Sequence, residues 1–214
     1  MNLVLVGPPG VGKGTQAARL VRQLALLPIA TGDILRAAVA GGTDLGKQVA
    51  ATIEAGGLVA DDVMVRLIRE RLTAADARYG WLLDGFPRTA TQAEALVRNL
   101  EEIEQTVHAV VRLSAPDEEI LTRLTGRLTC RECGVVTSRA AVPAGENGAC
   151  PDCDREALFV RNDDREETIR RRLEIYRRET EPVAEMLSRH YPLRNVSGVG
   201  TPEDVNQRLR SVLG

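Results

Sequence analysis

The sequence is poor in lysine, histidine and aromatic residues for its length. Of its 28 basic residues only Lys13 and Lys47 are lysines, there are 2 histidines, and aromatic residues make up 3% of the 214 residues. A net charge of -2 argues against binding to nucleic acid, which would need a basic and aromatic surface. No apolar run is long enough to cross a bilayer, and the first residues lack the pattern of a signal peptide. We therefore expect a cytosolic protein that binds neither nucleic acid nor a membrane.

A glycine-rich stretch at residues 7–15, Gly-Pro-Pro-Gly-Val-Gly-Lys-Gly-Thr, contains one of the two lysines. It follows an apolar run of strand length at 3–6 and precedes a helical pattern at 16–27. The backbone N–H groups of such a loop converge on one point, where the dipole of the next helix also favours an anion. Lys13 adds a positive charge, and Thr15 a hydroxyl suited to Mg²⁺. The stretch predicts a phosphate-binding loop, the alternative being a strand-to-helix turn with one surface lysine.

Apolar runs of strand length alternate with helical patterns along the rest of the chain. We expect further strands at 28–30, 81–84, 109–113 and 193–196, and helices at 34–40, 45–55, 61–77, 90–102, from Pro116 onwards, at 164–188 and at 202–213. Thr31 is expected to cap the helix that follows it. This alternation predicts an α/β fold, with a parallel sheet covered by helices on both faces and interrupted by two insertions.

Asp84 ends one of the expected buried strands and is followed by Gly-Phe-Pro-Arg at 85–88. An acidic residue at the carboxyl end of a parallel strand lies in the crevice where open α/β sheets bind ligands. We expect Asp84 to act on a magnesium ion through water, and the alternative is that it caps the next turn.

All four cysteines lie in one segment, as two Cys-x-x-Cys pairs: Cys130 with Cys133, and Cys150 with Cys153. This spacing predicts a four-thiolate zinc site, whereas disulfides would be unusual in a cytosolic protein. Four thiolates leave no ligand position open, so we interpret the metal as structural. Zinc ribbons also occur in nucleic-acid-binding proteins, but this segment lacks a basic and aromatic surface.

From end to end the chain resembles the long-form bacterial adenylate kinases that have a four-cysteine zinc-binding lid. The resemblance lies in the loop at 7–15, Thr-Gly-Asp-Ile-Leu-Arg at 31–36, Gly-Leu-Val at 57–59, Asp-Gly-Phe-Pro-Arg at 84–88, Arg123 with Arg127, Arg161 with Asp163 and Asp164, and Arg172. It implies a monomer with a five-stranded parallel sheet. The core is then 1–29 with 60–125 and 164–214, the AMP-binding flap 30–59, and the zinc-binding lid 126–163.

The resemblance also implies roles for single residues. The residues implied for ATP are Gly10, Val11, Gly12, Lys13, Gly14, Thr15, Arg123, Arg127 and Gly200. Those implied for AMP are Thr31, Gly32, Arg36, Gly57, Leu58, Val59, Gly85, Phe86, Arg88, Gln92, Arg161 and Arg172. The implied catalytic residues are Lys13, Asp84, Arg88, Arg127, Arg161 and Arg172, and the Phe86–Pro87 peptide bond is expected to be cis. In the run Arg170-Arg171-Arg172, the third arginine lies nearest the apolar face of its helix, which supports its assignment.

The implied activity is reversible phosphoryl transfer from magnesium-bound ATP to AMP, giving two ADP. The attacking phosphate oxygen of AMP is already anionic, so the protein needs no general base and works by positioning, charge stabilisation and exclusion of water under closed lids. The nearest alternative is a related nucleoside monophosphate kinase with another donor or acceptor, such as GTP with AMP. A phosphate-loop hydrolase is a further alternative, although Arg36 and Arg88 would then have no role.

Overall fold

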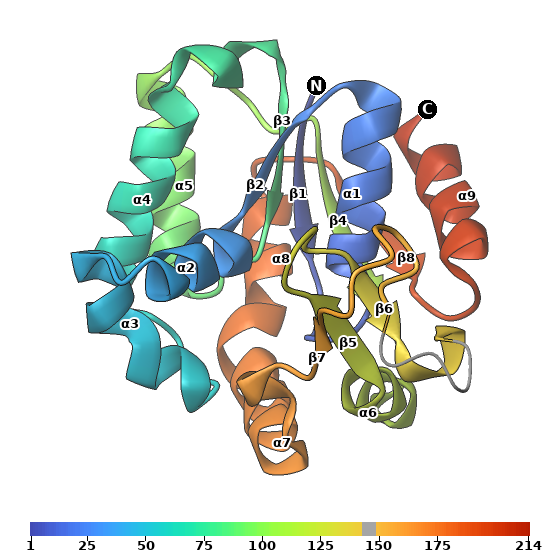
Figure 1. Ribbon diagram of the computed structural model, residues 1–214. Helices are drawn as coiled ribbons and strands as arrows, with labels where there is room; N and C mark the ends of the chain where they lie inside the picture. The colour runs from blue at the N-terminus through green and yellow to red at the C-terminus, as the bar shows by residue number, and fades with distance from the viewer. Residues whose placement is uncertain (143–148) are drawn as a thin grey trace.

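A five-stranded parallel sheet occupies the centre of the computed structural model, which describes residues 1–142 and 149–214 (Figure 1). Its order is β2-β3-β1-β4-β8, from β1 (Asn2–Val6), β2 (Leu27–Ala30), β3 (Trp81–Asp84), β4 (Ala109–Ser114) and β8 (Leu193–Ser197). The parallel pairing sets Asp84 level with Leu5 on one side and Ala30 on the other. The predicted α/β fold and its parallel sheet are confirmed.

Helices cover both faces of this sheet (Figure 1). One face packs against α1 (Lys13–Leu24) and α9 (Pro202–Leu213), and the other against α4 (Asp61–Thr73), α5 (Ala90–Glu102) and α8 (Glu181–Ser188). Along β1, Leu3 and Leu5 pack in the hydrophobic core on the side of α1 and α9, while Val4 and Val6 pack in the core on the side of α4, α5 and α8. Because both faces are buried, this strand reads as an unbroken apolar run.

Two expectations for the residues on either side of β2 are wrong. Helix α1 ends at Leu24 because Ala25 turns left-handed, with φ of 51°, and Leu27 already pairs with Trp81 in the sheet. Thr31 does not cap a helix but is the first residue of α2 (Thr31–Ala40). Its hydroxyl donates instead to the carbonyl of Gly85 at 2.9 Å. In both cases a contact with β3 or its following loop overrides the local preference.

The helix expected over 164–188 is divided into several pieces. A 3₁₀ turn (Asn162–Asp164) precedes α7 (Glu166–Ile175), a π turn (Tyr176–Thr180) and α8. Pro182 lacks the N–H that would continue the regular ladder of bonds, and the N–H of Glu181 bonds to the carbonyl of Tyr176. The helix expected to reach residue 77 likewise ends at Thr73 and gives way to a 3₁₀ turn (Ala75–Tyr79).

Two smaller units flank α7 in Figure 1. One is the helix pair α2 and α3 (Asp44–Glu54), and the other is an antiparallel sheet in the order β6-β5-β7, reached through α6 (Asp117–Thr125). Its strands are β5 (Arg127–Cys130), β6 (Val136–Ser138), which leads into a 3₁₀ turn (Arg139–Ala141), and β7 (Leu158–Phe159). Such short strands carry too little pattern to be predicted. Within the described ranges, no helix has the length and apolarity to span a membrane.

Candidate active site

Gly12 is the least crowded glycine of the loop that precedes α1. This residue precedes the first turn of α1 with φ of 104°, and no described atom lies within 4 Å of the position that a Cβ would take. The Nζ of Lys13 donates to the carbonyls of Gly7 at 2.7 Å and Pro8 at 2.9 Å. The loop therefore presents free space at a helix N-terminus with a lysine held beside it, which is the arrangement that a phosphate needs.

Lys13, the first residue of α1, and Asp84, the last residue of β3, are close enough for their charges to influence each other. Burial lowers the pKa of Lys13 to about 8, against the attraction of Asp84, and the nearby positive charges of Arg88, Arg172 and Arg127 lower it further. Burial likewise raises the pKa of Asp84, although Lys13 and Arg88 oppose that rise. Asp84 ends β3, at the carboxyl edge of the sheet, and its role towards magnesium stays a prediction.

Arg88 is held from both sides at the end of β3. Its Nε donates to the carbonyl of Gly85 at 2.8 Å, and its own carbonyl accepts from the hydroxyl of Thr180 at 2.8 Å. Gly85 has φ of 84°, and a Cβ there would lie 2.6 Å from the Oγ1 of Thr31, so only glycine fits. The Phe86–Pro87 bond is cis, as expected. Burial and the neighbouring Arg172 lower the pKa of Arg88 to about 10.

Two aspartates that follow the small sheet hold two of the predicted arginines. Arg127 donates to both oxygens of Asp164, at 2.7 and 2.5 Å. Arg172 pairs with Asp163 at 2.9 Å and with Asp164 at 3.4 Å. The Asp164 side chain is 0% exposed and that of Arg127 15%, so these are buried charge pairs. In the sequence, Asp163 and Asp164 are part of the resemblance to the family, but nothing there indicates that they bind Arg127 and Arg172.

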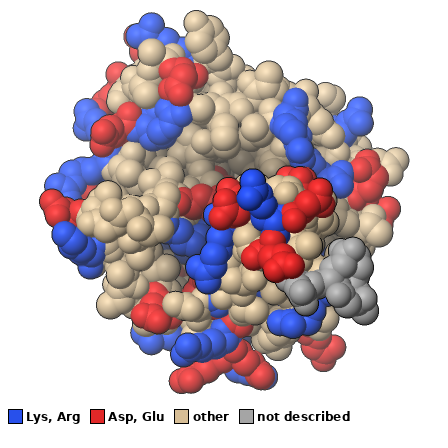
Figure 2. Space-filling view, in the orientation of Figure 1, with Lys and Arg blue, Asp and Glu red and all other residues tan. Residues whose placement is uncertain are grey.

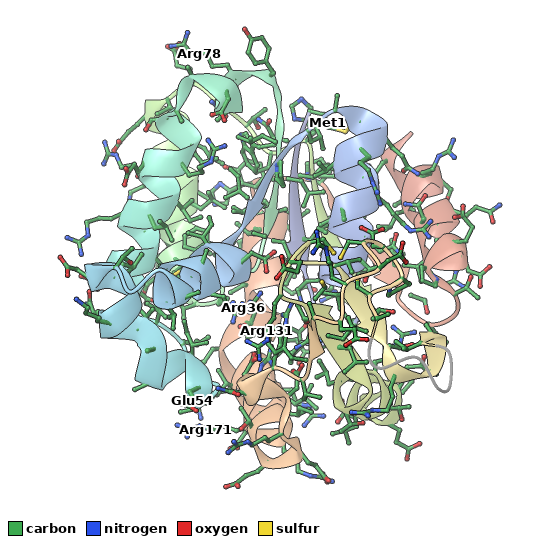
Figure 3. All side chains as sticks on the ribbon, in the orientation of Figure 1. Met1, Arg36, Glu54, Arg78, Arg131 and Arg171 are labelled. Atoms are coloured by element: carbon green, nitrogen blue, oxygen red, sulfur yellow. The ribbon has the colours of Figure 1, made fainter. Side chains whose placement is uncertain are left out.

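Arg161 completes the cluster of predicted cations. It is 9% exposed, and its Nε donates to the hydroxyl of Thr129 at 2.9 Å. Burial lowers its pKa to about 10, and the nearby charges of Arg36 and Arg127 act in the same direction. Arg36, in turn, donates to Asp33 at 2.6 Å. Figure 3 shows Arg36 on the side of α2 that faces α7 and the small sheet, whereas Arg171 points outward from α7.

Positive charge therefore exceeds negative charge at this end of the sheet. The basic groups that influence one another here are Lys13, Arg36, Arg88, Arg127, Arg161 and Arg172, and the acidic groups are Asp33, Asp84, Asp163 and Asp164. Elsewhere on the face in Figure 2, charges of both signs are interspersed. A concentration of guanidinium groups that are buried or partly buried is suited to the bidentate binding of phosphate oxygens.

Two cavities adjoin this cluster. The first is lined by Thr31, Gly32, Leu35, Arg36, Ile53, Gly56, Gly57, Leu58, Val59, Met64, Arg88, Gln92, Asp163 and Arg172. The residues that line the second include Gly7, Lys13, Gly85, Tyr176 and Thr180. Both are lined by Gly56, Leu58, Arg88 and Arg172, so the two cavities meet at the arginines.

Most residues implied for AMP line the first cavity. Gly85 lines the second instead, and the Phe86 side chain is 2% exposed and packs in the hydrophobic core. Sequence reasoning missed Leu35, Ile53, Gly56 and Met64, whose apolar or glycine character gave no chemical signal. Gly56 is nevertheless constrained, because a Cβ there would lie 2.9 Å from the Cγ of Arg172.

Arg123 and Gly200, which the resemblance implies for ATP, lie beside the glycine-rich loop. Arg123 donates to the carbonyl of Gly198 at 2.9 Å, and more weakly to those of Val11 at 3.3 Å and Gly200 at 3.4 Å. It also pairs with Glu119, one turn earlier on α6, at 2.7 Å. The structure thus brings Arg123 and Gly200 together beside the loop, where Gly14 and Thr15 are exposed.

The four cysteines converge although they come from different turns of the small sheet. Their sulfur atoms all lie within 4.8 Å of one another, with Cys130 and Cys153 at 3.7 Å and Cys133 and Cys150 at 3.6 Å. These separations far exceed a disulfide bond of about 2.05 Å. Four sulfurs around zinc at about 2.3 Å would lie about 3.8 Å apart, so the set could hold such an ion.

Comparison with known proteins identifies the family. The profile of the family described as adenylate kinase matches residues 5–191. The chain belongs to the adenylate kinase family. An adenylate kinase of Geotalea daltonii is 45% identical over 100% of this chain and 99% of its own length. An adenylate kinase of Thermodesulfovibrio yellowstonii is 45% identical over 100% of this chain and 99% of its own length. One of Archaeoglobus fulgidus is 42% identical over 100% of this chain and 98% of its own length. The resemblance drawn from the sequence is confirmed.

Proposed function

We infer that this adenylate kinase transfers a phosphoryl group reversibly from ATP to AMP, giving two ADP. The observation that carries this inference is the meeting of two cavities at Arg88 and Arg172, one beside the phosphate loop and the other beneath α2 and α3. A hydrolase needs room for one nucleotide and water, whereas two adjoining cavities suit a direct transfer between two bound nucleotides.

We assign the cavity of Thr31, Arg36 and Gln92 to AMP, and the loop of Gly10–Thr15 with Arg123 and Gly200 to ATP. Lys13, Arg88, Arg127, Arg161 and Arg172 would surround the phosphoryl group in transit. Charge that spreads over its oxygens is stabilised by guanidinium groups already fixed by Asp163 and Asp164, so little reorganisation is required. No general base is needed, since the AMP phosphate is anionic.

The residues also fit the two metal ions that the family resemblance implies. Thr15 and Asp84 would hold Mg²⁺, the aspartate through water, and the ion would neutralise charge on the ATP phosphates. Cys130, Cys133, Cys150 and Cys153 would hold a structural zinc ion. We propose that residues 30–59 act as a flap over AMP and residues 126–163 as a lid over ATP, with the rest as core. The cytosolic location and the monomeric state remain predictions.

The test is coupled turnover with ATP and magnesium over a panel of monophosphates, including AMP, GMP, CMP and UMP. We expect AMP to be the preferred acceptor, no turnover without magnesium, and little hydrolysis without an acceptor. Preference for another monophosphate, or ATP hydrolysis as fast as transfer, would overturn the assignment. Replacing ATP by GTP tests the donor.

Two matched variants test the arginines. Arg172→Ala should lower kcat by about a hundredfold or more, because its guanidinium is placed to contact the transferring group. Arg171→Ala removes the neighbouring exposed arginine and should leave kcat within about twofold. Equal kcat values for two well-folded variants would refute the role of Arg172.

A further inference from the structure

The side-chain amide of Gln92 is held in one orientation inside the first cavity. Its Oε1 accepts from the backbone N–H of Arg88 at 2.8 Å, and its Nε2 donates to Oδ1 of Asp61 at 2.7 Å. A backbone N–H can only donate and a carboxylate can only accept, so the reversed amide would lose both bonds. Gln92 is 2% exposed, and no exchange with bulk water compensates for such a loss.

Asp61 reaches this amide from another helix. It is the first residue of α4, whereas Gln92 lies in the first turn of α5. The same Oδ1 accepts from the hydroxyl of Thr89 at 3.0 Å, and that hydroxyl accepts from the N–H of Gln92 at 3.2 Å. Asp61 is therefore bonded to Gln92 directly and through Thr89.

We propose that Asp61 is a positioning residue that makes the acceptor cavity selective for a 6-aminopurine over a 6-oxopurine, by fixing the amide of Gln92. This inference rests on the proposed function. After its two bonds, the amide keeps one N–H and one lone pair for a ligand. A 6-aminopurine presents a donor at N6 beside an acceptor at N1, and a 6-oxopurine presents the reverse. An amide of fixed orientation can form both hydrogen bonds with the 6-aminopurine. Against the 6-oxopurine the same amide would set a donor against a donor and an acceptor against an acceptor.

The experiment compares Asp61→Ala with Asp62→Ala. Both substitutions remove an acidic residue from the first turn of α4 and so share the effect on its dipole, but the Asp62 side chain is 76% exposed and pairs with Arg66 at 3.8 Å. We measure kcat/KM for AMP and for inosine 5′-monophosphate, the KM for ATP, and the melting temperature. The ratio of the two kcat/KM values does not depend on the fraction of enzyme that is folded.

We expect Asp61→Ala to lower the AMP-to-inosine-monophosphate ratio by about tenfold, chiefly through a higher KM for AMP, with the KM for ATP unchanged. Asp62→Ala should leave the ratio within about twofold. Asp61→Asn should restore most of the selectivity, because an amide oxygen can still accept both bonds. A ratio in Asp61→Ala like that in Asp62→Ala, or an equal rise in the KM for ATP, would overturn the proposal.

A second variant keeps the test decisive if Asp61→Ala folds poorly. Gln92→Leu removes the amide, and in that background Asp61→Leu, whose side chain accepts neither bond, should change the ratio no further, because Asp61 acts through Gln92. A further loss of selectivity there would contradict the proposal. The proposed function fails separately, if the unmodified enzyme does not accept AMP at all.

Discussion

Replacing Asp164 by Asn should destabilise the free protein far more than replacing an exposed partner in a comparable ion pair. The Asp164 carboxylate accepts two bonds from Arg127 and a longer one from Arg172, and its side chain is 0% exposed. An asparagine of the same shape keeps one acceptor and turns an N–H₂ group towards a guanidinium. The substitution therefore leaves a buried positive charge without its counter-charge.

The expected cost follows from burial. Removing one partner of a buried ion pair costs about 3 kcal/mol, whereas an exposed pair contributes about 0.5 kcal/mol. The matched control is Glu166→Gln, since Glu166 pairs with Arg170 at 2.7 Å while both side chains are more than half exposed, at 63% and 64%. For a chain of this length, 3 kcal/mol corresponds to about 10 °C in Tm.

Urea unfolding followed by circular dichroism gives the free energy of unfolding of each variant, and thermal melts give Tm. We expect Asp164→Asn to lose about 3 kcal/mol and Glu166→Gln less than about 1 kcal/mol. Losses that agree within about 0.5 kcal/mol would show that burial does not strengthen the Asp164 pair, and would refute the argument that Asp164 holds the arginines in place.

Two further predictions concern Lys13 and the cysteines. The pKa of Lys13 is about 8 in the folded protein against 10.5 ordinarily, so the unfolded chain binds more protons between these values. The free energy of unfolding should therefore rise between pH 8 and pH 10.5, and Lys13→Met should abolish the part of this rise that comes from Lys13. The kcat/KM for ATP should fall above pH 8 as Lys13 loses its charge. A kcat/KM that does not change with pH in this range would contradict the prediction. Cys130→Ser with Cys133→Ser should abolish zinc binding, lower Tm and raise hydrogen exchange across β5–β7, while turnover persists at temperatures where the core is folded. Complete inactivity with exchange unchanged across these strands would show that the metal takes part in the chemistry.

The features that the sequence determined by itself are those whose signal lies within a few residues. The phosphate loop is recognised from closely spaced glycines and one lysine within residues 7–15, and each cysteine pair from its spacing of two intervening residues. The buried strands read as short apolar runs because both of their faces are covered. These local patterns were enough to predict the parallel sheet, the phosphate loop and the gathering of the four cysteines.

Only the tertiary structure decided how the side chains of the site are held. Asp164 meets Arg127 across 37 residues of sequence, and Asp61 meets Gln92 across 31. Thr31 contacts Gly85 instead of capping its own helix, and Thr180 reaches the carbonyl of Arg88 from a π turn. Each of these bonds joins segments that lie far apart along the chain, where periodicity and spacing carry no information. Their partners are selected by the packing of helices around the sheet, because a buried polar group must find a hydrogen bond wherever the fold places one.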